Sequence, residues 1–333
     1  MKAVGVLQGQ VLLTDLDPGP IPPGHVRIRT EFSAISPGTE MTYIQRGVDQ
    51  LSILGYSAVG VIEALGAEVK DRHVGQRVAC YGAPFVRHAE WLTVPTNLTA
   101  VVPEQVLPEE AAFAGLGAIA IHALRTADLR FGETAVIVGL GILGQLIAQI
   151  ASAAAVCVTA LDVNPQRVAL ARQGGVKAAY DSQELLEAEL ASGIGAAGAD
   201  SVILCTGGPG ESLMNSAMRW IRDRGTIVIV GDLTTQYSRG LMFGKEARVL
   251  ISRAGGPGRY DTQYELENRD YPIGYVRWTE GRNIEAYIRL LADKRISLHG
   301  LITDTYPLAR AEEAYKGYAS VSAAMGTLLT YGQ

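Results

Sequence analysis

The sequence predicts an α/β protein that combines a β-rich part with a doubly wound parallel sheet. Two observations predict this fold class. Short β-branched runs separated by Gly and Pro fill the first hundred residues, and strand-like runs alternate with helical patterns from Thr134 onward. The chain of 333 residues is long enough for about two domains. Its 48% hydrophobic and 19% charged residues argue against a largely disordered chain.

The β-rich part comes first and is expected to form a barrel or a sandwich. The expected strands share β-branched and aromatic residues bounded by turn signals, and they cover residues 26–30, 58–63, 76–81 and 90–94. A helical run then extends from Pro108 to Arg125.

The parallel sheet is expected from the pattern of apolar and helical segments after Thr134. Its strands are apolar without alternation, which indicates burial on both faces. They cover residues 135–138, 156–161, 201–205 and 226–230. Helical patterns between them, such as Pro165 to Gln173, predict βαβ units with helices on both faces of the sheet. A helix from Asn283 to Lys294 and short strands close the chain.

A glycine-rich turn joins the first strand of this sheet to its helix and fits the pattern G-x-G-x-x-G. Gly139 permits the tight turn, Gly141 lets the backbone approach a pyrophosphate, and Gly144 allows the helix to pack closely on the strand. The helix begins near Ile142 and Leu143, where unpaired N–H groups face the phosphates. The turn therefore predicts a dinucleotide-binding site.

Asp162 ends the next strand and predicts which dinucleotide is bound. An acidic side chain there accepts hydrogen bonds from the ribose hydroxyls and repels a 2′-phosphate, so we expect NAD(H). Arg167 lies nearby and leaves some use of NADP open. Alternatively, Asp162 is only a cap of the helix that Pro165 opens.

The ends of the later strands are expected to border the nicotinamide, since ligands bind beyond the carboxyl ends of parallel strands. The residues concerned are Cys205, Thr206, Gly207, Val230 and Gly231. Nothing near Cys205 in sequence would ionise its thiol, so we expect a buried small side chain and not a nucleophile.

Charge and cysteine content exclude other classes of protein. The net charge of −5 argues against a nucleic-acid-binding surface. Three scattered cysteines form neither a disulfide framework nor a four-cysteine zinc cluster. No apolar run reaches the ~20 residues of a membrane-spanning helix, and the first residues lack a cleavage pattern. We therefore expect a cytoplasmic protein that contacts no membrane.

Motifs along nearly the whole chain resemble the medium-chain dehydrogenase/reductase superfamily. They are the turn at 75–78 (Gly-Gln-Arg-Val), the strand-like segment 89–95 and the late segment 301–308. Within the superfamily, segments 33–40 and 55–60 look most like the branch of bacteriochlorophyllide, sorbitol and threonine dehydrogenase-like proteins.

The resemblance implies a domain organisation. A GroES-like β-barrel catalytic domain would comprise residues 1–118 and 283–333, and a Rossmann domain would comprise residues 119–282. It also implies a substrate cleft between the two domains and a homodimer formed through the Rossmann domain. Residues 252–282, rich in Arg and Tyr, would form a loop that contacts either the substrate or the second copy.

The positions of the superfamily's catalytic zinc ligands carry other residues in this chain. Ser36 stands where the resembling enzymes have Cys, and Tyr56 and Ser57 stand where they have His and Glu. No Cys, His or acidic residue occurs at 114–118. Since zinc takes three protein ligands from His, Cys and acids, we expect no metal.

Without zinc, another group must polarise a carbonyl or take a proton. Tyr56 is the first candidate, because the charge of a nicotinamide can lower the pKa of a phenol. Thr39 matches the hydroxyl relay position of the superfamily, and Glu40 matches the acid beside it. Alternatively, Tyr56 only fills the space of the metal and Glu40 only forms an ion pair.

Two histidines are secondary candidates for proton transfer. His88 and His122 are either proton carriers or ordinary packed residues.

We therefore expect a zinc-independent, NAD-dependent oxidoreductase that transfers hydride between the nicotinamide and a secondary alcohol or ketone. A polar substrate is expected, such as a sugar, a cyclitol or a hydroxy acid. Three other functions are also compatible with the sequence. They are an NAD(P)H-dependent enone or quinone reductase, an epimerase or lyase that retains NAD, and a redox-inert NAD-binding protein.

Overall fold

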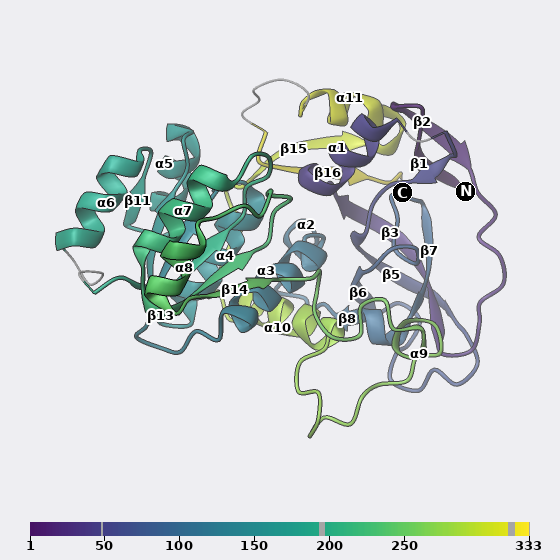
Figure 1. Cartoon of the computed structure of the whole chain (residues 1–333). Coiled ribbons are helices and arrows are strands. Elements are labelled where there is room, and N and C mark those ends of the chain that lie inside the picture. The colour runs from purple at the N-terminus through teal and green to yellow at the C-terminus, as the bar shows by residue number, and fades with distance from the viewer. Residues whose placement is uncertain (48, 193–196, 319–323, 333) are drawn as a thin grey trace. The chain divides into compact units, whose positions relative to one another are not determined.

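The computed structural model describes residues 1–47, 49–192, 197–318 and 324–332 (Figure 1). The chain divides into two compact units. The first unit consists of Met1–Ala118 and Gly255–Gln333, and the second consists of Ile119–Ala254. Within the described ranges, no helix is both long and apolar enough to cross a membrane.

The second unit contains a six-stranded parallel sheet, which confirms the predicted Rossmann fold class. In sheet order, its strands are β11 (Ala178–Tyr180), β10 (Cys157–Leu161), β9 (Thr134–Val138), β12 (Ala199–Leu204), β13 (Ile221–Ile229) and β14 (Arg248–Ile251). The strand order changes direction at β9, which pairs with β10 on one side and β12 on the other. Such a switch point is where doubly wound sheets bind ligands.

Helices cover both faces of this sheet (Figure 1). They are α4 (Ile142–Ala153), α5 (Pro165–Gln173), α6 (Gln183–Ser192), α7 (Glu211–Trp220) and α8 (Arg239–Lys245). Successive residues of a strand point to opposite faces. Val136 accordingly packs with Leu186 of α6 and Met214 of α7, whereas Ala135 packs with Ala151 of α4.

The first unit consists of two sheets whose strands come from both ends of the chain. The smaller sheet has the order β2 (Gln10–Asp15), β1 (Lys2–Leu7) and β4 (Ser52–Ile53). The larger sheet has the order β15 (Ile302–Pro307), β16 (Gly326–Thr330), β3 (His25–Ala34), β5 (Ser57–Leu65), β6 (Arg77–Tyr81) and β8 (Thr99–Val101), and β7 (Trp91–Pro95) also pairs with β3. Leu328 of β16 lies opposite Ala34 of β3, so the last strand of the structure joins the sheet that contains β3.

Short helices complete the first unit. They are α1 (Pro37–Arg46), α2 (Pro108–Ala111), α3 (Ala114–Ala127), α9 (Thr262–Glu265), α10 (Glu280–Ala292) and α11 (Ala311–Lys316), with 3-10 turns at Thr96–Leu98 and Leu308–Arg310. The helix expected from Pro108 to Arg125 is thus two helices, because α2 ends before α3 begins. Only the start of α3, up to Ala118, belongs to the first unit, and the rest of this helix, from Ile119 on, belongs to the second unit.

The structure places residues 255–282 in the first unit, which differs from the predicted boundary at 283. Polar contacts explain the difference. The side-chain oxygen of Asn268 accepts a hydrogen bond from the backbone N–H of Asn97 at 2.7 Å, and its side-chain nitrogen donates to Thr96 Oγ1 at 2.7 Å. Tyr264 is buried in the core beside Leu98. The Arg- and Tyr-rich stretch therefore belongs to the β-rich unit and not to the Rossmann unit.

Candidate active site

The glycine turn of the second unit follows β9 and opens α4, as its motif requires. Gly139 has a φ of +91°, a left-handed conformation that glycine adopts without strain. A Cβ atom added at Gly144 would lie 1.8 Å from the carbonyl oxygen of Gly139, so only glycine fits there. The helix can therefore start directly against the end of the strand.

The middle of the turn is open, in contrast to its two ends. A Cβ atom added at Gly141 would meet no heavy atom within 4 Å. Gly141 is the N-cap of α4, and the first N–H groups of a helix, here those of Ile142 and Leu143, have no partner within the helix. Open space in front of a helix N-terminus suits a phosphate group.

Asp162 lies at the end of β10 and binds the backbone of the same turn. Its carboxylate accepts hydrogen bonds from the N–H groups of Leu140 at 2.7 Å and Asn164 at 2.8 Å. Asn164, and not Asp162, caps α5 through the N–H of Gln166. The Arg167 guanidinium lies 3.5 Å from the Asp162 carboxylate. The acid, its basic neighbour and the glycine turn thus form one cluster.

The ends of β12 and β13 lie next to each other at the same edge of the sheet, because Leu204 pairs with Ile229. A Cβ atom added at Gly231 would lie 2.0 Å from the Thr206 carbonyl oxygen, and one added at Gly207 would lie 3.1 Å from the Asp232 carbonyl oxygen. The side chain of Val230 is partly buried at this edge. Close approach of the two strand ends explains the glycines.

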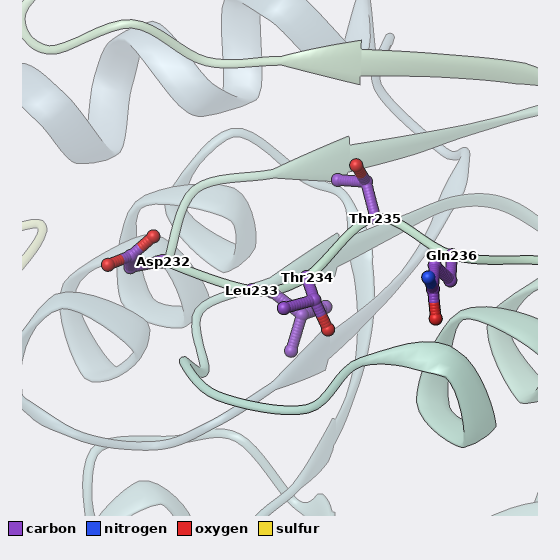
Figure 2. A pocket seen from close by; sticks show the side chains of 5 residues that line it. All are labelled: Asp232, Leu233, Thr234, Thr235 and Gln236. Carbon is purple, nitrogen blue, oxygen red and sulfur yellow. The ribbon is translucent and has the colours of Figure 1, made fainter.

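The Thr206 hydroxyl at this edge is buried and has no hydrogen-bond partner. A buried hydroxyl without a hydrogen bond destabilises the fold unless a ligand or a water molecule binds it. The loop after β13 adds an open pocket of about 480 Å³, lined by residues 232–236 (Figure 2). An acidic, an amide and two hydroxyl side chains lie along that loop, and the sequence interpretation had overlooked it.

These features fit a dinucleotide. The turn supplies backbone N–H groups at a helix start, Asp162 supplies an acidic acceptor, and Thr206 supplies an unused hydroxyl. Burial raises the pKa of Cys205 to about 12, so its thiol stays protonated at neutral pH. His122, also in the second unit, has its pKa lowered by burial and by Arg125 and Arg253.

In the first unit, Tyr56 and Ser36 form a hydrogen-bonded pair. The Tyr56 hydroxyl donates to Ser36 Oγ at 2.5 Å. Gly55 places Tyr56, since its φ is +96° and a Cβ atom there would lie 2.5 Å from the backbone nitrogen of His88. The ring of Tyr56 meets that of Tyr81 edge-on at 5.7 Å.

Burial raises the pKa of Tyr56 to about 12, and the Glu40 charge adds to that rise. The hydroxyls of Ser36 and Thr39 oppose it by hydrogen bonding to the phenolate. Without a bound cofactor, the pKa of Tyr56 is therefore raised and not lowered as we expected, because burial has the largest effect. Thr39 is exposed at the start of α1.

Glu40 is buried and accepts three hydrogen bonds. Its donors are the backbone N–H of Ser36 at 2.8 Å, Nε2 of His88 at 3.0 Å and the hydroxyl of Tyr315. Sequence reasoning singled out Ser36, Glu40 and His88 separately, and the structure brings them together. It missed Tyr315, which no local pattern connects with Glu40.

The remaining positions of the superfamily's zinc ligands have structural roles here. Ser57 Oγ donates to the Ala112 carbonyl at 2.6 Å and accepts from the Gly115 N–H at 2.8 Å, so it joins β5 to the start of α3. A Cβ atom at Gly115 would lie 2.7 Å from Tyr81, which leaves no room for a ligand side chain. Within the described ranges, no group of three or more His, Cys, Asp or Glu residues is arranged to hold a metal ion. The donors present do not fit zinc.

A second missed residue of the first unit is Glu280, the first residue of α10. Its side chain is fully buried, and neither carboxyl oxygen has a hydrogen-bond partner. Burial, reinforced by Glu265, raises the pKa of Glu280 to about 9, while Arg259 acts in the opposite direction.

Comparisons with known proteins agree with this geometry. Residues 22–127 match the family model of the alcohol dehydrogenase GroES-like domain, and residues 143–268 match that of the zinc-binding dehydrogenase. The chain is 26% identical over 349 residues to the D-xylulose reductase of Saccharomyces cerevisiae, covering 92% of this chain and 91% of that protein. It is 29% identical over 272 residues to the D-guloside 3-dehydrogenase of Escherichia coli, covering 80% of this chain and 73% of that protein.

Solved structures show the same fold. The galactitol-1-phosphate dehydrogenase of Escherichia coli superposes with a TM-score of 0.81 at 22% identity, covering 99% of this chain and 100% of that one. Both units of the present chain therefore have counterparts in dehydrogenases and reductases. The chain is an oxidoreductase that belongs to the medium-chain dehydrogenase/reductase, or alcohol dehydrogenase-like, superfamily.

Proposed function

We propose that the protein is a zinc-independent, NAD(H)-dependent dehydrogenase that interconverts a secondary alcohol and a ketone on a polar substrate. The observation that carries the proposal is the Tyr56–Ser36 pair, which occupies two positions where zinc-dependent relatives are expected to hold their metal. The absence of a three-ligand cluster among the described residues supports it. The named relatives act on sugar-related compounds, which supports a sugar, a cyclitol or a hydroxy acid as substrate.

In the direction of ketone reduction, a bound NADH would supply the hydride to the carbonyl carbon. The carbonyl oxygen then needs a proton. Tyr56 is the proposed general acid because its hydroxyl carries a proton and is oriented by Ser36, although burial raises its pKa to about 12 and so makes it a weaker acid than a free phenol. In the resting protein the single phenolic proton is donated to Ser36. Transfer of that proton to the substrate oxygen therefore requires the Ser36 hydroxyl to turn and donate to Tyr56, which stabilises the phenolate that is left. Thr39 offers a second hydroxyl at the exposed start of α1.

NAD(H) is the proposed cofactor because Asp162 places a carboxylate beside the glycine turn. A 2′-phosphate would meet this negative charge, whereas ribose hydroxyls would donate to it. Arg167 partly offsets the charge from 3.5 Å. We therefore expect the protein to bind NAD(H) more tightly than NADP(H), without excluding NADP(H).

A polar substrate is supported by the aromatic and basic residues of the first unit. The Arg259 guanidinium lies over the ring of Tyr260 at 4.2 Å and forms an ion pair with Glu265. Tyr260 is 62% exposed, and its phenol is close enough to Tyr56 to contribute to the raised pKa of Tyr56. An exposed phenol held near the proposed acid can bind substrate hydroxyls.

The test is a cofactor and substrate screen on the purified protein. NADH-dependent reduction of D-xylulose and NAD-dependent oxidation of galactitol and L-galactonate are measured, with NADPH and NADP as matched cofactors. Activity that survives exhaustive chelation, with no stoichiometric zinc by elemental analysis, supports the proposal. Stoichiometric zinc whose removal abolishes activity would refute zinc independence.

The same screen separates the other functions. Turnover of quinones or enones without any polyol oxidation would assign a quinone or enone reductase. Conversion of the substrate without net NADH formation would assign an epimerase or lyase that retains its cofactor. Tight NADH binding without turnover of any substrate would assign a redox-inert binding protein.

We also propose a homodimer formed through the second unit. Strand β14 is an edge strand of the parallel sheet, and its Ile251 is 70% exposed. An apolar sheet edge is suited to pairing with a second copy. Light scattering that shows a monomer at micromolar concentration would refute it.

A further inference from the structure

The Glu40 network is a set of six buried or half-buried polar residues behind the Tyr56–Ser36 pair. Its members are Ser33, Ser36, Glu40, His88, Tyr315 and Tyr331. They come from β3, the start of α1, the segment before β7, α11 and the end of the chain. Glu40 is 2% exposed and His88 is 0% exposed, so water does not reach the centre of the network.

The carboxylate of Glu40 determines the direction of the surrounding hydrogen bonds, because an ionised carboxylate only accepts. Nε2 of His88 therefore donates to Glu40 Oε2. In a neutral imidazole, Nδ1 then accepts from the Ser33 hydroxyl at 2.6 Å, and Ser33 in turn accepts from Tyr331 at 2.6 Å. One consistent direction satisfies the polar atoms from Tyr331 to Glu40.

Both tyrosines of the network are suited to donating. Burial and the charge of Glu40 raise the pKa of Tyr315 well above its ordinary value, and burial likewise raises the pKa of Tyr331. They therefore keep their protons over the working pH range. A fully satisfied buried network of this kind is rigid.

The network reaches the proposed acid through Ser36. Ser36 is the N-cap of α1, yet its hydroxyl makes no capping hydrogen bond. Instead, Glu40 from the first turn accepts the Ser36 N–H at 2.8 Å. The Ser36 backbone is thereby fixed while its hydroxyl stays free to bind Tyr56, as acceptor while Tyr56 holds its proton and as donor once that proton has been transferred.

We propose that His88 and Tyr315 are positioning residues. They hold Glu40 so that Glu40 holds Ser36, and Ser36 orients the Tyr56 phenol for proton transfer. The proposal rests on the proposed role of Tyr56 as the acid. It gives Tyr315, which is far from Tyr56 in the sequence, a role in orienting the proton transfer at Tyr56.

The first experiment does not depend on activity. Nitrogen-15 NMR of the full chain reports the tautomer of each histidine, and His88→Gln identifies the signal of His88. A neutral ring protonated on Nε2 and accepting at Nδ1 is expected. A ring protonated on Nδ1 alone, which cannot donate to Glu40, would overturn the proposal.

The second experiment compares Tyr315→Phe with Tyr318→Phe. Tyr318 lies close by in sequence, but its hydroxyl donates to Thr327 Oγ1 at 2.6 Å and not to Glu40. In Tyr315→Phe the Ser36 amide resonance is expected to shift, and kcat for NADH-dependent reduction of D-xylulose is expected to fall about tenfold while KM stays within about twofold. Tyr318→Phe is expected to leave both unchanged.

The two readouts separate failure of this inference from failure of the proposed function. An unchanged Ser36 resonance in Tyr315→Phe would overturn the inference whatever the activity. An equal fall of kcat in both variants would also overturn it, because a general loss of packing would then explain the effect. A wild-type protein inactive on the whole substrate screen would refute the proposed function, while the NMR readouts would still decide this inference.

Discussion

Glu280→Gln is expected to stabilise the protein above neutral pH. Glu280 is fully buried, its carboxyl oxygens lack hydrogen-bond partners, and its pKa is raised from 4.5 to about 9. The folded chain therefore keeps a proton on Glu280 that the unfolded chain loses once the pH exceeds about 4.5. Since the folded state binds more protons in this window, the free energy of unfolding falls as the pH rises.

The size of the effect follows from the shift. Between the two pKa values, each pH unit lowers the free energy of unfolding by about 1.4 kcal/mol. At pH 7 the total loss of stability is about 3 kcal/mol. Gln resembles the protonated acid in shape and cannot ionise. The variant is therefore expected to be about as stable as the wild type at pH 5 and more stable by a few kcal/mol at pH 8.

The assay is urea denaturation followed by tryptophan fluorescence at pH 5, 6, 7 and 8. Glu285→Gln is the matched control, because Glu285 lies on the same helix and is exposed. The wild type and the control are expected to lose stability with rising pH more steeply than Glu280→Gln. Parallel pH dependences for all three proteins would refute the reasoning.

Three further predictions concern the two sites. Tyr56→Phe is expected to lower kcat about 100-fold with little change in stability, measured on D-xylulose and by thermal unfolding, because a general acid is removed; unchanged turnover across the pH range would leave Tyr56 as a space-filling residue. Gly144→Ala is expected to abolish NADH binding in fluorescence titrations, since its Cβ would lie 1.8 Å from the Gly139 oxygen; retained affinity would contradict this. Asp162→Asn is expected to reduce the ratio of NADPH to NADH dissociation constants about tenfold, and a constant ratio would refute the charge argument.

The Rossmann unit could be predicted because its signals are local. Strand, glycine turn and helix follow one another within a short stretch from Thr134 to Ala153, and apolar strands mark a sheet that is buried on both faces. Asp162 was identifiable because it ends the next strand. The orphaned Thr206 hydroxyl and the pocket after β13 depend on how two strand ends meet, which no local pattern encodes.

The Glu40 network could not be predicted as a unit. His88 is 48 residues from Glu40 and Tyr315 is 275 residues from it, so only the folded sheets bring them together. The same reason explains the misplaced boundary at 283. The Arg- and Tyr-rich stretch follows the Rossmann strands in sequence, but Asn268 and Tyr264 bind residues near Asn97.

The interleaved order of the two units determines how the chain is completed during synthesis. The second unit is contiguous, whereas the first needs β16 to pair with β3. Strand β3, which precedes the Rossmann unit in the chain, therefore waits for β16, which follows that unit. Until then, the edge of β3 that β16 will cover stays unpaired, although the Rossmann unit has already been fully translated. A nascent chain of this protein can thus fold its Rossmann unit before its β-rich unit is complete.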